Sequence, residues 1–236
     1  MKSISTVVLA IYAGILTFVL AWLLLVPNHH QTFETIDVHR INVRESDGTI
    51  RLVLSSRDRF PGVIGHNKEY PHPDRTDAAG LIFYNDEGTE NGGLIIGGKR
   101  IGDKVVNFGH LSFDQYDQDQ VVTLEQTEQD GQRTSGLKIT DQPNAPFNFE
   151  SLNQLDKLPP AQRDAALQRL KDSGLLSHTR GFFGKNEDQD TVLDLKDRQG
   201  RVRLRLRVTA DGEAAIDFLN AEGRVVKRER PPSTKP

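Results

Sequence analysis

The chain has 236 residues, a formal net charge of −3 at pH 7 and no cysteine. A slightly acidic chain has no overall field that attracts nucleic acid, so the composition argues against a nucleic-acid partner. Without cysteine, no disulfide can stabilise a domain outside the cytosol, and such a domain must rely on its hydrophobic core.

The first predicted element is a hydrophobic helix. Ile4 to Val26 is a run of 23 residues without a charged side chain, and 14 of them are Leu, Ile, Val or Phe. As a helix this run would span roughly 35 Å, which exceeds the roughly 30 Å hydrocarbon core of a bilayer. The sequence therefore predicts a membrane anchor over residues 1–26.

A cleaved signal peptide is the alternative to this anchor. A signal peptide has an apolar core of about 7 to 15 residues and a small-x-small cleavage site, whereas this segment ends Trp22-Leu-Leu-Leu-Val26-Pro27. Lys2 precedes the helix while Arg40 and Arg44 follow it, so the positive-inside rule favours a cytoplasmic N-terminus. The remaining chain would then face the periplasm or the cell exterior. Because one lysine carries this argument, a cytosolic domain is the alternative topology.

Beyond a linker at residues 27–36, alternating apolar and polar segments are separated by turns that carry Asp or Asn with Gly. The clearest turns are Asp47-Gly48, Asn85 to Gly88, Asp130-Gly131, Asp197 to Gly200, Asp211-Gly212 and Asn220 to Gly223. Glycine accepts positive φ, and Asp or Asn hydrogen-bonds the following backbone, so such turns join antiparallel strands into hairpins. We expect about ten or eleven strands over residues 37–228, in a mainly β antiparallel meander closed into a barrel or a propeller-like array.

Residues 149–176 interrupt the strand pattern. Phe149 to Leu158 and Pro160 to Leu176 have helical spacing, and Pro160 suits a first helical turn. We expect this helical insert to cover a sheet edge or a barrel end, with a lid over a functional site as the alternative. The proline-rich residues 229–236 are predicted to form a disordered tail.

Four arginines alternate with apolar residues in one predicted strand. They are Arg201, Arg203, Arg205 and Arg207. Such a row could bind the phosphate or carboxylate of a lipid head group or an acidic glycan. The flanking turns would, however, place Asp194 opposite Arg203 and Asp217 opposite Arg207. An ordinary charged outer face is therefore the stronger interpretation.

The long loop at residues 57–80 contains aromatic, imidazole and carboxylate groups. They are His66, Tyr70, His72 and Asp74. Loops of this length are either functional or disordered, so the four residues are candidates for ligand binding or acid–base chemistry. The two histidines are six residues apart, which does not match the i, i+4 spacing of a helical metal motif, so no metal site is predicted. A structural loop made rigid by proline is the leading interpretation.

Acidic and amide residues gather in three places and could hold calcium or supply paired carboxyls to a glycosidase. The groups are Asp114 with Asp117 and Asp119, residues 85–90, and residues 186–190. None matches a calcium loop of about 12 residues, and turns are rich in Asp and Asn for backbone reasons. Turn formation is therefore the leading interpretation.

Phe182 and Phe183 stand together between two glycines. Adjacent residues of a strand point to opposite faces, so one ring would be buried and the other exposed. We expect the pair to fill the core beneath the insert, with contact to a partner or a bilayer as the alternative. The sequence lacks a phosphate-binding loop, a nucleophile elbow and a dinucleotide-binding motif, so catalysis is disfavoured and no cofactor is predicted.

Four segments resemble those of a family of bacterial signal-anchored envelope proteins. They are Arg59-Phe-Pro-Gly62, Lys68-Glu-Tyr-Pro-His-Pro73, Asn85-Asp-Glu-Gly88 and Asn91-Gly-Gly-Leu-Ile95. The resemblance covers most of residues 37–228. It implies a location in the bacterial envelope, but no activity and no site residue.

These observations favour a non-catalytic binding or scaffolding module, anchored in the bacterial inner membrane, that contacts other envelope proteins or associates with itself. One alternative is an envelope enzyme acting on glycan or peptidoglycan through Asp114, Asp117 or the loop with His66, His72 and Asp74. Another is a protein that binds anions or lipid head groups through its row of arginines.

Overall fold

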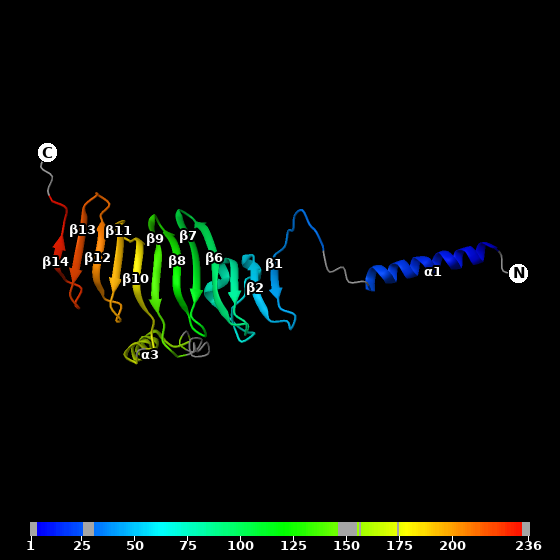
Figure 1. Cartoon of the computed structure of the whole chain (residues 1–236), viewed down its shortest axis with the longest axis horizontal. Helices are drawn as coiled ribbons and strands as arrows, with labels where there is room; N and C mark the ends of the chain where they lie inside the picture. Colours follow the sequence, from blue (N-terminus) through cyan, green and yellow to red (C-terminus); the bar gives the residue numbers. More distant parts are fainter. Residues whose placement is uncertain (1–3, 26–30, 146–154, 156, 174, 233–236) are drawn as a thin grey trace. The chain divides into compact units, whose positions relative to one another are not determined.

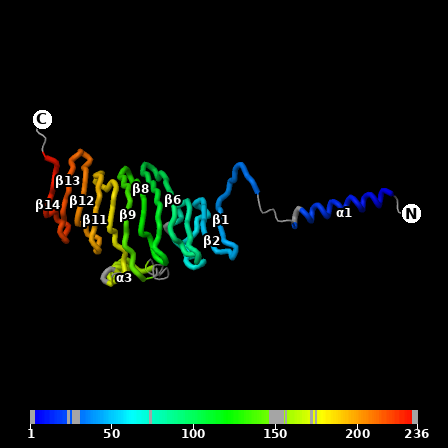
Figure 2. The backbone as a smooth tube through the Cα atoms, viewed as in Figure 1, coloured from blue at the N-terminus to red at the C-terminus, as the bar shows by residue number. Residues whose placement is uncertain are grey.

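The structure is a computed structural model that describes residues 4–25, 31–145, 155, 157–173 and 175–232 (Figures 1 and 2). Residues Met1–Val38 and His39–Pro236 form two compact units. The first unit contains helix α1 (Ile4–Leu25), which confirms the predicted apolar helix. Its segment Ile4–Trp22 is long and apolar enough to cross a membrane, although a signal sequence passes the same test.

Most of the second unit is one antiparallel sheet of 12 strands, in which each strand pairs with the next one along the chain. The strands are β1 (Arg40–Arg44), β2 (Ile50–Ser55), β5 (Ala79–Tyr84), β6 (Glu90–Ile101), β7 (Lys104–Asp114), β8 (Gln120–Gln129), β9 (Gln132–Asp141), β10 (His178–Lys185), β11 (Thr191–Lys196), β12 (Val202–Val208), β13 (Ala214–Leu219) and β14 (Val225–Glu229). The predicted mainly β meander is confirmed. Because β14 extends to Glu229, the sheet includes the first residue of the predicted tail.

The sheet is open, with β1 at one end and β14 at the other. Figure 1 shows its strands side by side in a single layer. The predicted closure into a barrel or a propeller-like array is not found among the described residues. Closure requires a common strand tilt and register stagger that bring the first strand against the last, and alternation within each strand does not encode this stagger.

Seven hairpin turns share one hydrogen-bond pattern, in which the first N–H donates to the fifth carbonyl and the fourth N–H donates to the first carbonyl. The turns are residues 45–49, 85–89, 115–119, 186–190, 197–201, 209–213 and 220–224. Five have a glycine with positive φ at the fourth position. In the turn 115–119 the positive φ falls instead on Asp117, one position earlier. The Asp/Asn and Gly turns predicted from the sequence are confirmed.

The long loop after β2 is folded into a covering segment, which we define as residues 56–78. It contains the short helices η1 (Arg57–Arg59) and η2 (Pro73–Asp77) and a two-stranded sheet of β3 (Val63–Gly65) and β4 (Lys68–Tyr70). Phe60 and Ile64 of this segment pack against a buried cluster of sheet residues, Ile50, Val53, Ile82 and Tyr84. Among the described residues, this buried cluster therefore lies at the N-terminal end of the sheet, on one face.

Part of the predicted helical insert is confirmed, because helix α3 spans Pro160–Asp172. The first predicted helix, Phe149 to Leu158, lies largely outside the described residues. The insert leaves β9 at Asp141 and returns to β10 at His178, and Figure 1 draws α3 beside the ends of these two strands. Because β9 and β10 are inner strands of the sheet, α3 covers neither edge strand, β1 or β14, and the predicted edge-covering role is not found among the described residues.

Candidate functional site

An apolar ladder crosses the sheet from β1 to β13. We define it as eleven residues, one per strand, each directly opposite the next: Ile41, Leu54, Leu81, Leu94, Leu111, Leu124, Leu137, Phe183, Leu193, Leu206 and Ile216. On β14 the partner of Ile216 is Glu229, which ends the ladder with a charge. Since directly opposite residues point to the same face, the ladder is one uninterrupted apolar row.

A second apolar row runs beside the ladder on the same face. Its members are Val43, Leu52, Phe83, Gly92, Phe113, Val122, Ile139, Gly181, Leu195, Leu204 and Phe218, followed by Lys227 on β14. Gly92 lies between Phe83 and Phe113, whose rings stack across it at a centroid distance of 6.4 Å. The two rows together form a surface that we call the apolar face.

The apolar face is less buried than the face behind it. No ladder residue is buried, and Leu124 and Phe183 are 55% and 58% exposed. In contrast, Asp194 and Asp217 on the opposite face are 5% and 3% exposed. A closed barrel would have buried this apolar side, whereas the open sheet leaves it exposed. Soluble proteins seldom expose an apolar surface this continuous unless it binds something.

Two hollows lie along the apolar face, and Phe183 stands between them. One, of about 600 Å³, is lined by Phe183, Leu193, Leu206 and Ile216, among others. The other, of about 630 Å³, is lined by Phe183, Gly109, Leu111, Leu124 and Leu137, among others. Gly109 has no side chain to fill the second hollow. The exposed ring of Phe183 therefore forms a ridge between these two hollows.

The opposite face, which we call the polar face, carries a row of alternating charges over its C-terminal strands. Asp194, Arg205, Asp217 and Arg228 lie directly opposite one another on β11 to β14. Arg205 donates two hydrogen bonds to Asp194, at 2.6 and 2.7 Å, and Arg228 donates two to Asp217, at 2.5 and 2.9 Å. The Arg228 hydrogen bond, together with nearby Arg207 and Arg205, lowers the pKa of Asp217.

The structure corrects the predicted register of the arginine row. Asp194 and Asp217 both lie opposite Arg205, not opposite Arg203 and Arg207. For Asp194, the turn at 197–201 is one residue longer than the predicted turn, and a bulge lies between Leu195 and Lys196. For Asp217, the turn at 209–213 is centred on Asp211, one residue before the centre that pairing with Arg207 would need.

All four predicted anion-binding arginines are within ion-pair distance of a carboxylate. Arg201 and Arg203 approach Asp197, at 2.9 and 3.6 Å. Arg205 binds Asp194, and Arg207 lies 3.6 Å from both Asp190 and Asp217. Because each guanidinium already has an anionic partner, this row is a cross-strand ion-pair network and offers little to an external anion.

The two adjacent phenylalanines have different environments. Phe182 lies on the polar face, where its ring covers Gly136 and Gly184, and a Cβ at either glycine would meet the ring. Phe183 is the exposed ridge of the apolar face. The predicted split between the two faces is confirmed, but neither ring fills a core beneath the helical insert.

The four predicted residues of the long loop are distributed over the covering segment. His66 lies in the β3–β4 turn, and Tyr70 ends β4 with the Lys68 ammonium 4.8 Å from its ring centroid. His72 lines a hollow of about 680 Å³ with residues that include Arg57, Glu69 and Arg75. Asp74 belongs to η2, and its side chain lies outside the described part of the chain. The structure thus does not gather these four residues into one site.

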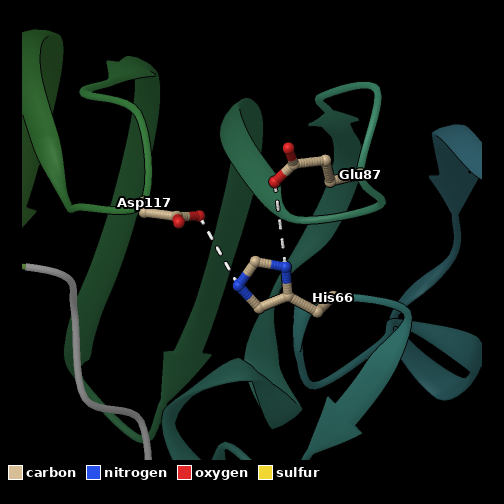
Figure 3. Close-up of side chains that lie close together, drawn as sticks. All are labelled: His66, Glu87 and Asp117. Atoms are coloured by element: carbon tan, nitrogen blue, oxygen red, sulfur yellow. Dashed lines mark ion pairs between the residues drawn. The ribbon is translucent and has the colours of Figure 1, made fainter.

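His66 instead meets two acidic residues from other turns (Figure 3). Its Nδ1 lies 3.9 Å from Oε2 of Glu87, and its Nε2 lies 3.7 Å from Oδ1 of Asp117. Tyr116 donates a 2.7 Å hydrogen bond to Glu87, which raises the pKa of Tyr116 to about 12. Asn67, next to His66, donates its backbone N–H to Gly88. These contacts bind the β3–β4 turn to the turns 85–89 and 115–119.

The same three residues could hold a metal ion, since their ligand atoms lie within 4.8 Å of one another. They form the one such group among the residues that the structure describes. However, the two carboxylates approach opposite nitrogens of the ring, whereas a single ion uses one nitrogen. The geometry is that of an imidazole bridging two carboxylates. We therefore assign the cluster a structural role in joining turns.

Asp114 is the described carboxyl with a strongly raised pKa. Burial raises the pKa of Asp114 to about 7, and the negative charges of Glu90 and Asp119 add to this effect. Its Oδ1 has no hydrogen-bond partner among the described residues. Asp114 and Asp117 line none of the four hollows described in this structure. This carboxyl can hold a proton near neutral pH, and none of those four hollows opens onto it.

The other predicted acidic groups mainly stabilise turns. Oδ1 of Asn85 accepts hydrogen bonds from the backbone N–H groups of Glu87 and Thr89. Oδ1 of Asn186 similarly accepts from the N–H of Asp190. The turn interpretation is supported at both places, and calcium binding there stays a prediction.

Comparison with protein-family models finds no match, and comparison with curated proteins finds none either. The resemblance to bacterial signal-anchored envelope proteins therefore stays a prediction.

Sequence reasoning missed the apolar face and the cluster around His66. The alternation that forms the ladder was visible in the sequence of each strand. The exact partner of each residue, however, depends on bulges and turn positions that the sequence did not show. The β3–β4 turn had a local signal, because His66-Asn67 is a two-residue turn with positive φ at both positions, and Asn favours that conformation.

Proposed function

We propose that the protein is a membrane-anchored binding module whose binding surface is the apolar face of its sheet. Helix α1 holds the chain in a bilayer, and the sheet presents the apolar ladder to a partner. The proposed location is the bacterial inner membrane, with the sheet in the periplasm or at the cell exterior.

One observation carries this proposal: eleven directly paired apolar residues form a row along which no residue is buried. At a strand spacing of about 4.8 Å, a row that crosses eleven strands is roughly 50 Å long. A sheet face with this pattern normally packs against a second layer, because leaving it in water forfeits the hydrophobic free energy of burial. The described residues supply no second layer on this face, which favours a binding partner.

The location rests on α1 and on the charges around it. Lys2 precedes the helix, and the next charged residue is Glu34. The positive-inside rule then favours a cytoplasmic N-terminus. Sodium carbonate extraction of membranes from cells making the full chain tests the anchor: the chain should stay in the membrane pellet. Release into the supernatant, or a mature chain that begins after Pro27, would refute the anchor.

The binding surface is tested by site-specific photo-crosslinking in intact cells. A photoreactive amino acid replaces Leu124 on the apolar face or, as a matched control, Thr127 on the polar face of the same strand. Both positions are exposed. We expect a discrete adduct from position 124 that Phe183→Asp weakens, and no adduct from position 127. Equal labelling at both positions, or none at position 124, would contradict the proposal.

The anion-binding alternative loses support because its four arginines are paired with carboxylates. For the alternative of a glycan-acting enzyme, the raised pKa of Asp114 is the one favourable observation. A glycosidase also needs a second carboxyl across a cleft. The binding module therefore remains the function that the geometry supports best.

A further inference from the structure

We infer that the apolar face binds a second copy of the same chain, so that two sheets pack face to face with their apolar ladders in contact. This inference rests on the proposed function, because it names the partner of that same surface. Each single-layer sheet would become one half of a β-sandwich.

The area of the apolar face matches what a stable dimer requires. The face is roughly 50 Å long, and its two rows lie about 7 Å apart along the strands, so with side chains the strip is about 14 Å wide. That gives roughly 700 Å² per copy, close to the approximately 800 Å² that each partner buries in a standard-size protein interface. An acyl chain or detergent molecule lying on the open apolar face would itself stay exposed to water on its other side. A second sheet would instead cover the apolar face and have its own apolar face covered.

The relief of the apolar face is self-complementary about one particular axis. Take a two-fold axis that runs parallel to the strands between β8 and β9, the sixth and seventh of the twelve strands. It places β10 of one copy over β7 of the other. The Phe183 ridge then meets the strand of Gly109 and Leu111, which line the 630 Å³ hollow, and the partner's Phe183 meets the same strand of the first copy.

A two-fold axis across the strands is less favourable. It would stack β10 on β10 and oppose one Phe183 ridge to the other. In an isologous contact the same surface lies on both sides, and if residue i contacts residue j, then j also contacts i. A ridge on this surface therefore needs a hollow elsewhere on the same surface. The axis parallel to the strands satisfies this condition.

The charges of the sheet agree with this arrangement. In the ladder and the second row, charged side chains occur only on β14, as Glu229 and Lys227 at the rim. The ion-paired row of Asp194, Arg205, Asp217 and Arg228 lies on the polar face, which would form the solvated outside of the sandwich. Anchoring both copies in one bilayer raises their effective concentration and favours association further.

The test uses the purified full chain reconstituted into phospholipid vesicles, where a second copy is the only protein available. Because the chain has no cysteine, each introduced cysteine is a unique attachment point. The two layers of a sandwich lie about 10 Å apart, too far for most disulfides, so a short bis-maleimide crosslinker is used. Leu124→Cys lies beside the proposed axis, and Thr127→Cys on the polar face of the same strand is the matched control.

We expect Leu124→Cys to form a crosslinked dimer several-fold more efficiently than Thr127→Cys. Adding Phe183→Asp to Leu124→Cys should remove that excess, while β-sheet circular dichroism is retained, because Phe183 is 58% exposed and supports no core. Ile41→Cys, at the far end of the ladder, should crosslink to its own counterpart poorly. Efficient self-crosslinking through Ile41→Cys would overturn the proposed axis.

Equal and low crosslinking of Leu124→Cys and Thr127→Cys would overturn the second copy as the partner. The proposed function fails separately, in the cellular experiment. If the photoreactive residue at position 124 captures a different molecule there, while the purified chain does not self-associate, the apolar face is a binding surface and only the identity of its occupant is wrong.

Discussion

Replacing Asp217 by Asn should lower the local stability of the C-terminal end of the sheet and leave the stability of its central strands unchanged. The Asp217 side chain is 4% exposed and accepts two hydrogen bonds from Arg228. Breaking a buried ion pair by removing one charge costs about 3 to 5 kcal/mol. Because the Arg228 side chain is 33% exposed and can recover some hydration, we take the lower end, about 3 kcal/mol.

This loss should be local, since each strand of the meander pairs only with its neighbours. In such quasi-one-dimensional arrays, stability is a sum of local and nearest-neighbour contributions. Hydrogen–deuterium exchange followed by mass spectrometry measures it strand by strand. A loss of about 3 kcal/mol should speed exchange of the slow amides in β13 and β14 by roughly 100-fold. Amides in β7 and β8 should keep their wild-type rates.

Glu222→Gln is the matched control, because Glu222 forms an exposed 3.8 Å ion pair with Arg224 in the neighbouring turn. Exposed pairs contribute little, so exchange should stay at the wild-type rate. The pKa of Asp217 is lowered by folding, so its contribution is present above the ordinary pKa of 3.8 and is lost as pH falls through the lower folded value. Exchange in β13 and β14 that is unchanged in Asp217→Asn, or accelerated equally in β7, would refute this reasoning.

Three further predictions test the burial and charges of the sheet. Val53→Ala should lower the free energy of unfolding by about 2 kcal/mol, because Val53 is 0% exposed. Leu54→Ala should lower it by less than about 1 kcal/mol, because Leu54 is 46% exposed. Both are measured by chemical denaturation in a monomeric background such as Phe183→Asp, and equal losses would contradict the assignment of the faces. Folding raises the pKa of Asp114 from 3.8 to about 7, so wild-type stability should fall as pH rises through that window, and Asp114→Asn should flatten the slope and stabilise the chain at pH 8 by about 2 to 4 kcal/mol. A lower melting temperature of this variant at pH 8 would contradict the prediction. The contacts of His110, 3.8 Å away, and of Lys138 lower the pKa of Glu125 to about 2. The stabilising contribution of Glu125 should be lost as pH falls from about 4.5 to about 2, so the stability gap between wild type and Glu125→Gln should close over that window. A constant gap in acid titrations would contradict the assignment.

Local features of the fold were predictable because short-range chemistry determines them. The turn at Asp130-Gly131 and the turn at 220–223 carry residues that accept positive φ or cap the backbone, and both form hairpins. The helix from Pro160 follows from helical spacing and a proline suited to a first turn. Each of these signals lies within a few residues of the element that it specifies.

The candidate site was less predictable because it depends on exact register. The predicted partners of Asp194 and Asp217 were wrong by two residues. A bulge and a longer turn changed the pairing of Asp194, and a turn centred one residue earlier changed that of Asp217. A shift of two keeps a residue on the same face, so the charged face was foreseen while its ion pairs were not. The group of His66, Glu87 and Asp117 joins three separate turns, and no sequence spacing reports such an encounter.

By itself, the sequence determined an uncharged N-terminal helix, a meander of antiparallel hairpins and a period-two alternation that gives each strand one apolar side. Only the tertiary structure decided that the sheet stays open and that residues 56–78 cover the polar side of its N-terminal end, leaving the apolar ladder exposed. The physical reason is that alternation encodes which side of a strand is apolar, whereas what covers that side depends on contacts between distant segments and on the shear that would close a sheet.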